Sequence, residues 1–250
     1  MTHGENVDFR GARLDDPDFS DARLHGASFE GARLTEVWLG NARIEANISG
    51  SLDGLRINGV EIAPLVEAEL DRQYPDRVKL RATDPSGLLK GWTMVEDVWR
   101  TTTERAQRHP RAVLHGRVDD DWSFVETLRH LIFAHDCWLN RMVRGEPHPY
   151  HQWGLAGPWL SNPSELDIDP IATPSFDEVL QVRHERLDVA RATYGALTPT
   201  ELDRVCVPPD TPGHPMDPHT VRECVQTILE EEWEHARYAN RDLDALAPPA

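Results

Sequence analysis

A repeat with a period of five residues runs through the first 46 residues of the chain. From residue 7 to residue 46 the blocks read VDFRG ARLDD PDFSD ARLHG ASFEG ARLTE VWLGN ARIEA. The first place of each block is small or compact. The third place is always large and apolar, at Phe9, Leu14, Phe19, Leu24, Phe29, Leu34, Leu39 and Ile44. This period fits neither an α-helix of about 3.6 residues per turn nor a strand with a period of about two. It fits a coil of square cross-section with one block to a side, in which large residues point inward and small ones fill the corners.

These blocks resemble those of the pentapeptide-repeat family. The resemblance implies a right-handed β-helix with about four blocks to a coil, so that this stretch makes about two coils. We expect the third-place residues to be buried inside the β-helix. Because a repeat stack needs its ends covered and two coils bury little apolar surface, we also expect the β-helix to pack on the rest of the chain.

The repeat gives way to a turn-rich segment after residue 46. Three glycines mark turns there, at Gly50, Gly54 and Gly59. Three apolar residues are suited to a last strand or coil edge, at Ile57, Val60 and Ile62. We therefore predict a β-helix over residues 1–60, a connector over residues 61–82 and a second domain over residues 83–250.

From residue 83 the apolar residues recur with helical spacing. Asp84 precedes Pro85 at the first helix start, and each later start has a Ser or Thr followed three residues on by Glu, as in a capping box. These pairs are Ser123 with Glu126, Ser175 with Glu178, and Thr220 with Glu223. We expect the second helix to end at Gly145 and the fourth at about Leu246. Four helices of about 20 residues, with a long loop over residues 146–174, predict a four-helix bundle. The predicted fold class is α+β, a short right-handed pentapeptide β-helix followed by this bundle.

Composition and charge narrow the classes of function. The chain has 250 residues, of which 39% are hydrophobic, enough for a substantial core. It has no run of 18 apolar residues and no signal-peptide pattern at its start, so we expect a cytoplasmic protein without a membrane span. A formal charge of −17 opposes binding to nucleic acid or to anionic membranes. Lysine occurs only at Lys79 and Lys90, and this arginine bias is typical of GC-rich bacterial genomes.

The cysteines indicate neither a disulfide framework nor a cysteine-based zinc site. They are odd in number and widely spaced, at Cys137, Cys206 and Cys224. We expect three buried thiols without a catalytic role.

The stretch ILEEEWEHARYANRDL, residues 228–243, combines a run of glutamates with a histidine. Glu231 and His235 are four residues apart and lie on one face of a helix. In the second predicted helix, His130 stands among apolar residues. Each feature alone is ordinarily a solvated face or a core histidine, but helical bundles also present metal ligands with this spacing. We prefer Glu231 to Glu232 because it lies about 40° from His235 around the helix, whereas Glu232 lies about 60° to the other side.

Two motifs together resemble those of the DinB-like family: WSFVETLRHL at residues 122–131 and EEWEH at residues 231–235. Within that family the chain is similar to mycothiol-dependent maleylpyruvate isomerases and related bacterial thiol transferases. The resemblance covers roughly residues 83–246. It implies that His130, Glu231 and His235 are the three ligands of a divalent metal ion, with open positions for water and substrate. Two imidazoles and one carboxylate with an open position are typical of a catalytic site.

Two functions from different classes fit these features. The first is a metal-dependent enzyme, with zinc or nickel, that transfers or uses a low-molecular-weight thiol of the mycothiol or bacillithiol type on a small electrophilic substrate. The second is a non-catalytic interaction protein, in which the β-helix binds a protein partner or a second copy and the metal is structural. A closed sphere of four protein ligands would favour the second.

Other polar residues are weaker candidates. His135 lies about 140° round the helix from His130 and should face elsewhere, and Asp136 is expected at the polar surface. Arg129 and Arg237 are candidates to bind a carboxylated substrate, with salt bridges as the default. Residues in the Pro-rich loops are candidates to touch a ligand, and Trp153 and Trp159 are expected to cover the core. The loop histidines are His148, His151, His214 and His219, and His184 is expected at the surface of the third helix.

Overall fold

The computed structural model describes residues 7–24, 26–44, 51–118, 121–157, 160 and 162–246. The chain divides into two compact units, residues 1–46 and residues 47–250. The predicted domain limits at residues 60 and 82, and the predicted packing of the β-helix on the rest of the chain, stay predictions.

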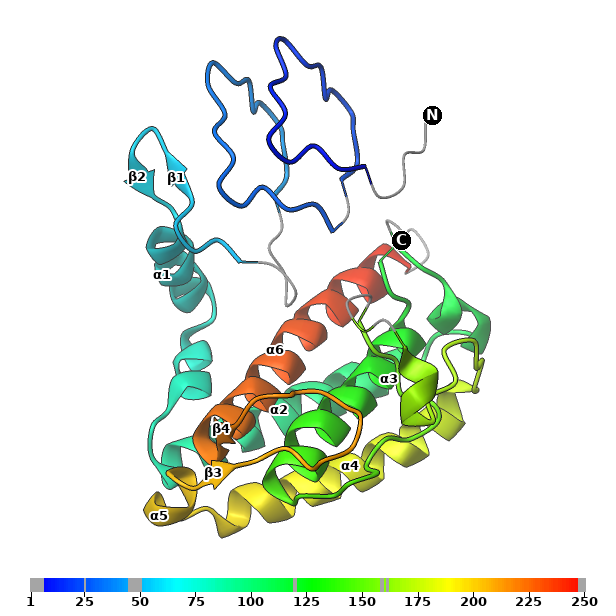
Figure 1. Ribbon diagram of the computed structural model, residues 1–250. Coiled ribbons are helices and arrows are strands. Elements are labelled where there is room, and N and C mark those ends of the chain that lie inside the picture. Colours follow the sequence, from blue (N-terminus) through cyan, green and yellow to red (C-terminus); the bar gives the residue numbers. More distant parts are fainter. Residues whose placement is uncertain are drawn as a thin grey trace. The chain divides into compact units, whose positions relative to one another are not determined.

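The first unit turns a corner every five residues (Figure 1). The fifth place of each of the first seven blocks takes the left-handed backbone conformation, which Gly, Asp and Asn adopt more readily than other residues. The φ angles lie between 52° and 71°, at Gly11, Asp16, Asp21, Gly26, Gly31, Glu36 and Asn41. At every second corner the amide of the next block bonds back to the third-place carbonyl, as from Ala12 to Phe9 at 2.9 Å. The five-residue period therefore sets the corners of the coil.

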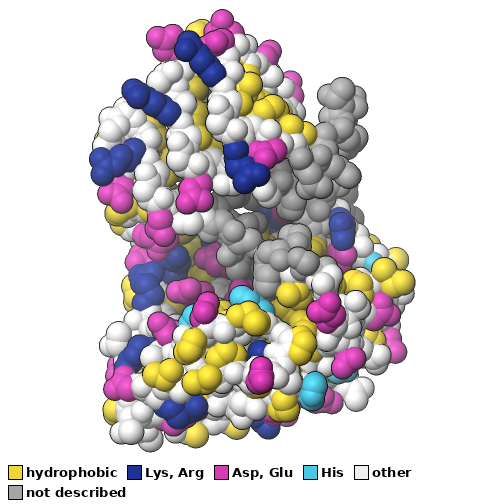
Figure 2. Space-filling view, in the orientation of Figure 1, with side chains coloured by type: hydrophobic (Ala, Val, Ile, Leu, Met, Phe, Trp, Pro, Cys, Tyr) yellow, Lys and Arg dark blue, Asp and Glu magenta, His cyan; other side chains and the backbone are white. Residues whose placement is uncertain are grey.

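The predicted burial of the eight third-place residues is wrong. Their exposed fractions run from 46% at Leu39 to 64% at Ile44, and apolar atoms of this unit reach the surface in Figure 2. No strand is present in the described residues between 7 and 44. The physical reason is the length of the stack, because two coils give each layer of side chains a neighbouring layer on one side only.

The second unit begins with a hairpin and a helix. Strands β1 (Arg56–Ile57) and β2 (Val60–Glu61) pair antiparallel. Asn58 and Gly59 join them with φ angles of 51° and 85°, as a two-residue hairpin loop requires. Helix α1 (Ala63–Gln73) and the 3₁₀ helix η1 (Pro75–Arg81) follow. The connector is therefore largely helical, which the sequence patterns did not predict.

Four helices form the main body of the second unit (Figure 1). They are α2 (Pro85–Ala106), α3 (Phe124–His135), α4 (Phe176–Ala196) and α6 (Val221–Ala245). The predicted starts are confirmed: the Asp84 side chain accepts from the amide of Gly87, and all three capping boxes are formed. Helix α3 continues as a π-helical segment, η3 (Asp136–Val143), before Gly145 with its φ of 72°.

These helices surround one core. Helices α2 and α3 each pack against both α4 and α6, so the four helices close into a ring. Each helix contributes fully buried residues to this core, among them Trp92, Leu131, Val179 and Ile228. A smaller cluster joins α3 and η3 to the loop over residues 146–174 and consists of Phe133, Cys137, Leu166 and Ile168. The three cysteines are buried and free, as predicted.

Short elements connect the helices. They are η2 (Arg111–His115), η4 (Pro163–Leu166), α5 (Pro199–Leu202), and the antiparallel strands β3 (Val205–Cys206) and β4 (His219–Thr220). Within the described part of the chain, no helix has the length and apolar character that a membrane crossing needs.

Candidate metal centre

Helices α3 and α6 bring together the three residues predicted as metal ligands. Helix α3 supplies His130, and α6 supplies Glu231 and His235 one turn apart. Each residue offers one ligand atom, and these atoms all lie within 4.8 Å of one another. Oε2 of Glu231 lies 3.4 Å from Nε2 of His130 and 3.4 Å from Nε2 of His235. We call these residues the metal-ligating group.

A backbone carbonyl fixes the orientation of His130. Its Nδ1 lies 2.9 Å from the carbonyl oxygen of Leu155, in the loop over residues 146–174. Because a carbonyl only accepts hydrogen bonds, Nδ1 carries the hydrogen, and a neutral ring then presents its Nε2 lone pair to Glu231. Second partners of this kind commonly orient histidines that bind metals.

Two buried atoms of the metal-ligating group have no hydrogen-bond partner among the residues that the structure describes. They are Oε2 of Glu231 and Nε2 of His235. Buried polar atoms are nearly always paired, and lone pairs that face one another at this distance repel unless a positive charge lies between them. The arrangement therefore suits a bound cation.

Burial and the neighbouring charges set the protonation of this group. Burial lowers the pKa of His235 below its usual range, although Glu231 opposes the shift. Burial raises the pKa of Glu231, but attraction to a proton carried by His130 or His235 outweighs that effect and holds the pKa at about 2. A bound metal ion would take the place of that proton. An ionised carboxylate beside a neutral imidazole is the state in which both residues bind a metal ion.

Trp122, the first residue of the WSFVETLRHL motif, covers both imidazoles. Its ring centroid lies 4.5 Å from that of His130 and 5.9 Å from that of His235, with an interplanar angle of 21° to the latter. The two histidine side chains keep 9% of their surface exposed and Glu231 keeps 14%. The group is thus largely shielded from solvent.

The residues fit a zinc-like ion. Two ligand atoms, each about 2.1 Å from a tetrahedral ion, lie about 3.4 Å apart. The two separations from the Glu231 oxygen, 3.4 Å each, match that value, and all three ligand atoms lie within 4.8 Å of one another. Imidazole and carboxylate ligands suit zinc and nickel. Among the described residues, the cluster of possible metal-ligating side chains consists of these three residues. Catalytic zinc sites commonly take three ligands from the protein.

Comparison with known protein families identifies this helical region. Residues 94–239, which include all three members of the metal-ligating group, match the model of the DinB superfamily. The chain belongs to the DinB superfamily. Residues 9–49 match the model described as pentapeptide repeats (9 copies). Neither a curated protein nor a solved structure matches the chain.

Glu232, the alternative to Glu231, faces a different part of the DinB domain. Its carboxylate is fully buried and bonds to His135 and Arg183. His135 faces away from the metal-ligating group, as predicted. The prediction for Asp136 is wrong, because this residue is fully buried and its carboxylate accepts from Arg186 at 2.7 Å. The ion pair with Arg186 makes that burial tolerable.

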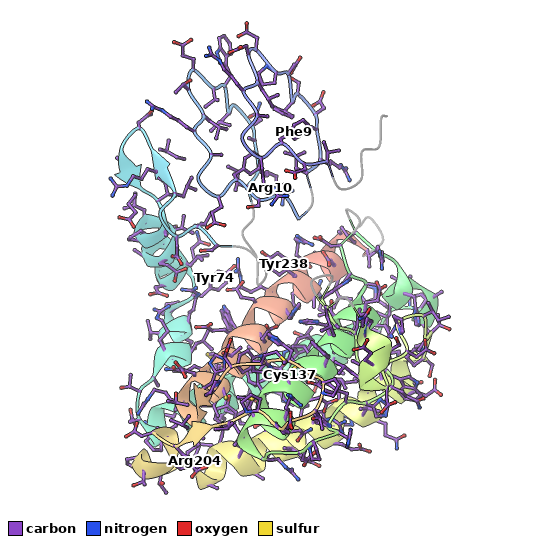
Figure 3. All side chains as sticks on the ribbon, viewed as in Figure 1. Phe9, Arg10, Tyr74, Cys137, Arg204 and Tyr238 are labelled. Carbon is purple, nitrogen blue, oxygen red and sulfur yellow. The ribbon has the colours of Figure 1, made fainter. Side chains whose placement is uncertain are left out.

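Arg129 and Arg237 are both engaged within the second unit of the chain. Arg129 is buried and donates hydrogen bonds to three backbone carbonyls of the loop over residues 146–174. These are the carbonyls of Trp153, Asp169 and Ala172. It therefore holds that loop, and with it the Leu155 carbonyl, against α3. Arg237 pairs with Glu234 at 2.5 Å and packs on the ring of Tyr74, which lies beside α6 (Figure 3).

The other predicted candidates lie outside the metal-ligating group as far as the structure describes the chain. His148 and His184 are exposed, and Trp153 packs against the main core. The remaining loop histidines are partly buried, His214 and His219 against Trp138 and His151 against Trp153. Trp159 lies outside the described residues.

Two groups were missed in the sequence: the Leu155 carbonyl, which orients His130, and Arg183, which pairs with Glu232. The Leu155 carbonyl carries no side-chain signal. Arg183 did carry one, because it occupies the apolar stripe of α4 between Val179 and Leu187. A charged residue on a buried helix face indicates a buried partner, and here that partner is Glu232.

Proposed function

We propose that His130, Glu231 and His235 bind one divalent ion, zinc or nickel, and that the DinB domain uses it to transfer or use a low-molecular-weight thiol on a small electrophilic substrate. The observation that carries the proposal is the convergence of three ligand atoms, two of which are buried without a hydrogen-bond partner among the described residues. When bound, such an ion lowers the pKa of a coordinated thiol and so supplies a thiolate nucleophile.

The protein's own cysteines are unsuited to supply that thiolate. Burial raises the pKa of the Cys137, Cys206 and Cys224 thiols, which keeps them protonated at neutral pH. An external thiol of the mycothiol or bacillithiol type fits this arrangement.

The surrounding residues prepare the group for such a co-substrate. The Leu155 carbonyl holds His130 in the tautomer whose Nε2 is free, and Trp122 shields one side of both imidazoles from water. Glu231 contributes a negative charge that balances part of the charge of the ion. With three protein ligands, a position stays available for the thiol.

A specific observation supports the second function, an interaction protein. Trp38 in the pentad coil, which comprises the repeat blocks over residues 7–44, is 97% exposed, and the apolar third-place residues of the coil are 46–64% exposed. Exposed apolar surface of this kind is typical of contact sites for proteins. In that case the coil binds a protein partner or a second copy, and the metal holds α3 and α6 together.

Turnover assays on the metal-loaded protein distinguish the two functions. A panel of thiols and electrophiles is assayed with the wild type, with Glu231→Gln and with His184→Ala, which alters an exposed histidine of α4. Thiol consumption by the wild type and His184→Ala, but not by Glu231→Gln, supports the enzyme. A metal without an exchangeable water ligand, together with no turnover, supports the interaction protein.

A further inference from the structure

Glu232 is the meeting point of the four main helices. Its carboxylate accepts from Nη2 of Arg183 on α4, which lies 2.9 Å from each oxygen, and from Nε2 of His135 on α3 at 2.5 Å. Its backbone carbonyl accepts from Nε1 of Trp99 on α2 at 3.0 Å. One residue of α6 is thus bonded to all three neighbouring helices. We call Glu232, His135 and Arg183 the Glu232 network.

Stability alone gives little reason for a charged network at this depth. The three side chains are 0%, 1% and 2% exposed. Replacing a buried ion pair with apolar residues of similar volume is often neutral or stabilising, because ions lose hydration when they are buried. Charge-assisted hydrogen bonds with this geometry do, however, favour one arrangement of the helices over others.

The Glu232 network joins the same two helices as the metal-ligating group. Glu232 follows Glu231 directly, and His135 comes five residues after His130. A slip of one residue turns a helix by about 100° and shifts it by about 1.5 Å, whereas metal–ligand bonds tolerate errors of only about 0.2 Å. The rotation and axial position of α6 against α3 therefore decide whether the three ligand atoms converge.

We propose that the Glu232 network fixes α6 against α3 and so positions Glu231 and His235 for the ion that His130 also binds. Its members are positioning residues, since none of them belongs to the metal-ligating group. This role rests on the proposed metal site. It implies that the metal affinity of that site depends on the Glu232 network in the core.

A triple variant separates positioning from stability. Glu232→Met, His135→Phe and Arg183→Leu together replace the network with apolar side chains of similar size. The matched control is Glu96→Met with Arg191→Leu, which removes an ion pair of 2.7 Å between α2 and α4. Each protein is measured for its metal-free unfolding midpoint, its Kd for Zn²⁺ by chelator competition, and its visible spectrum with Co²⁺.

The triple variant should keep the metal-free midpoint while its Kd for Zn²⁺ rises by about 10- to 100-fold and its Co²⁺ spectrum changes. The control should keep both the wild-type Kd and the wild-type spectrum. Should the triple variant not fold, Glu232→Gln decides, because it retains an acceptor for Arg183 but loses the charge, and its Kd should rise by about tenfold.

An unchanged Kd in the folded triple variant, or in Glu232→Gln when the triple variant does not fold, would overturn the positioning role. The same holds if the control loses as much affinity as the triple variant. A wild type that binds no Zn²⁺ would instead contradict the proposed metal site itself, so the two failures are distinguishable.

Discussion

Oε2 of Glu231 lies 3.4 Å from Nε2 of His235, one turn further along α6, and neither buried atom has a hydrogen-bond partner in the described part of the chain. In the folded protein the Glu231 oxygen faces two imidazole nitrogens, Nε2 of His235 and Nε2 of His130. A cation among them relieves their repulsion, whereas the unfolded chain does not hold them together. Binding of the ion should therefore be coupled to folding.

Zinc should stabilise the folded protein. At a free concentration of about 100 times its Kd, an ion that binds only the folded state raises the free energy of unfolding by about 2.7 kcal/mol. Urea unfolding followed by circular dichroism, with Zn²⁺ or with a chelator, measures the difference. Glu231→Gln should remove it, and an equal gain in this variant would show that the ion binds elsewhere.

Arg183→Met should be among the most destabilising single changes in the DinB domain. It leaves the fully buried carboxylate of Glu232 with His135 as its remaining side-chain partner. Removing one partner of a buried pair costs about 3–5 kcal/mol. Arg191→Met is the control, because Arg191 is 56% exposed and exposed pairs contribute about 0–1 kcal/mol. Similar urea midpoints for the two variants would contradict the importance of Glu232.

Glu126 should make stability depend on pH. Burial raises its pKa, but Arg117 and the Ser123 amide outweigh burial, so that the folded-state pKa lies below the usual value. A depressed pKa stabilises the folded state above the unfolded-state pKa of about 4.3, and this contribution is lost as the pH falls through the folded-state pKa.

Metal-free wild type should therefore exceed Glu126→Gln in unfolding free energy by about 1 kcal/mol at pH 7, the usual size of a capping effect. The difference should shrink as the pH falls below about 4. Urea titrations at several pH values measure it. A difference that is constant with pH would show that the charge of Glu126 does not contribute.

Two glycines of the pentad coil test its left-handed corners. Gly31 is in the left-handed conformation with a φ of 68°, whereas Gly40 is not. A Cβ added at either position would meet no other atom within 4 Å. Gly31→Ala should cost about 1 kcal/mol, whereas Gly40→Ala should cost nothing. Limited proteolysis of the full chain should then cut the coil about five times faster in Gly31→Ala. Equal rates would contradict the corner assignment.

The helix starts could be predicted because their chemistry is local. At Ser123, Ser175 and Thr220 the cap oxygen and the amide that it accepts are three residues apart, so the sequence alone defines the contact. The pairing of Glu231 with His235 is local in the same sense. That His130 meets them from another helix was predictable only through the family motif.

Other features depend on contacts that no local pattern encodes. Helix α1 has no buried residue. Ile62, Leu65, Val66 and Leu70 do have helical spacing, but this pattern is shorter than the window that predicts a helix. The network of Glu232 joins residues 49 and 97 positions apart. Burial in the coil was predicted from the period alone, but it depends on the number of coils, and this stack is too short to cover its own interior.

Metal content tests the central claim most directly. After dialysis against buffer without metal, elemental analysis of the wild type should find one zinc or nickel ion per chain. His235→Ala should retain none while its helical circular dichroism stays nearly unchanged, and His184→Ala should match the wild type. A His235→Ala protein that kept stoichiometric metal would contradict the assignment of Glu231, His235 and His130 as the metal site.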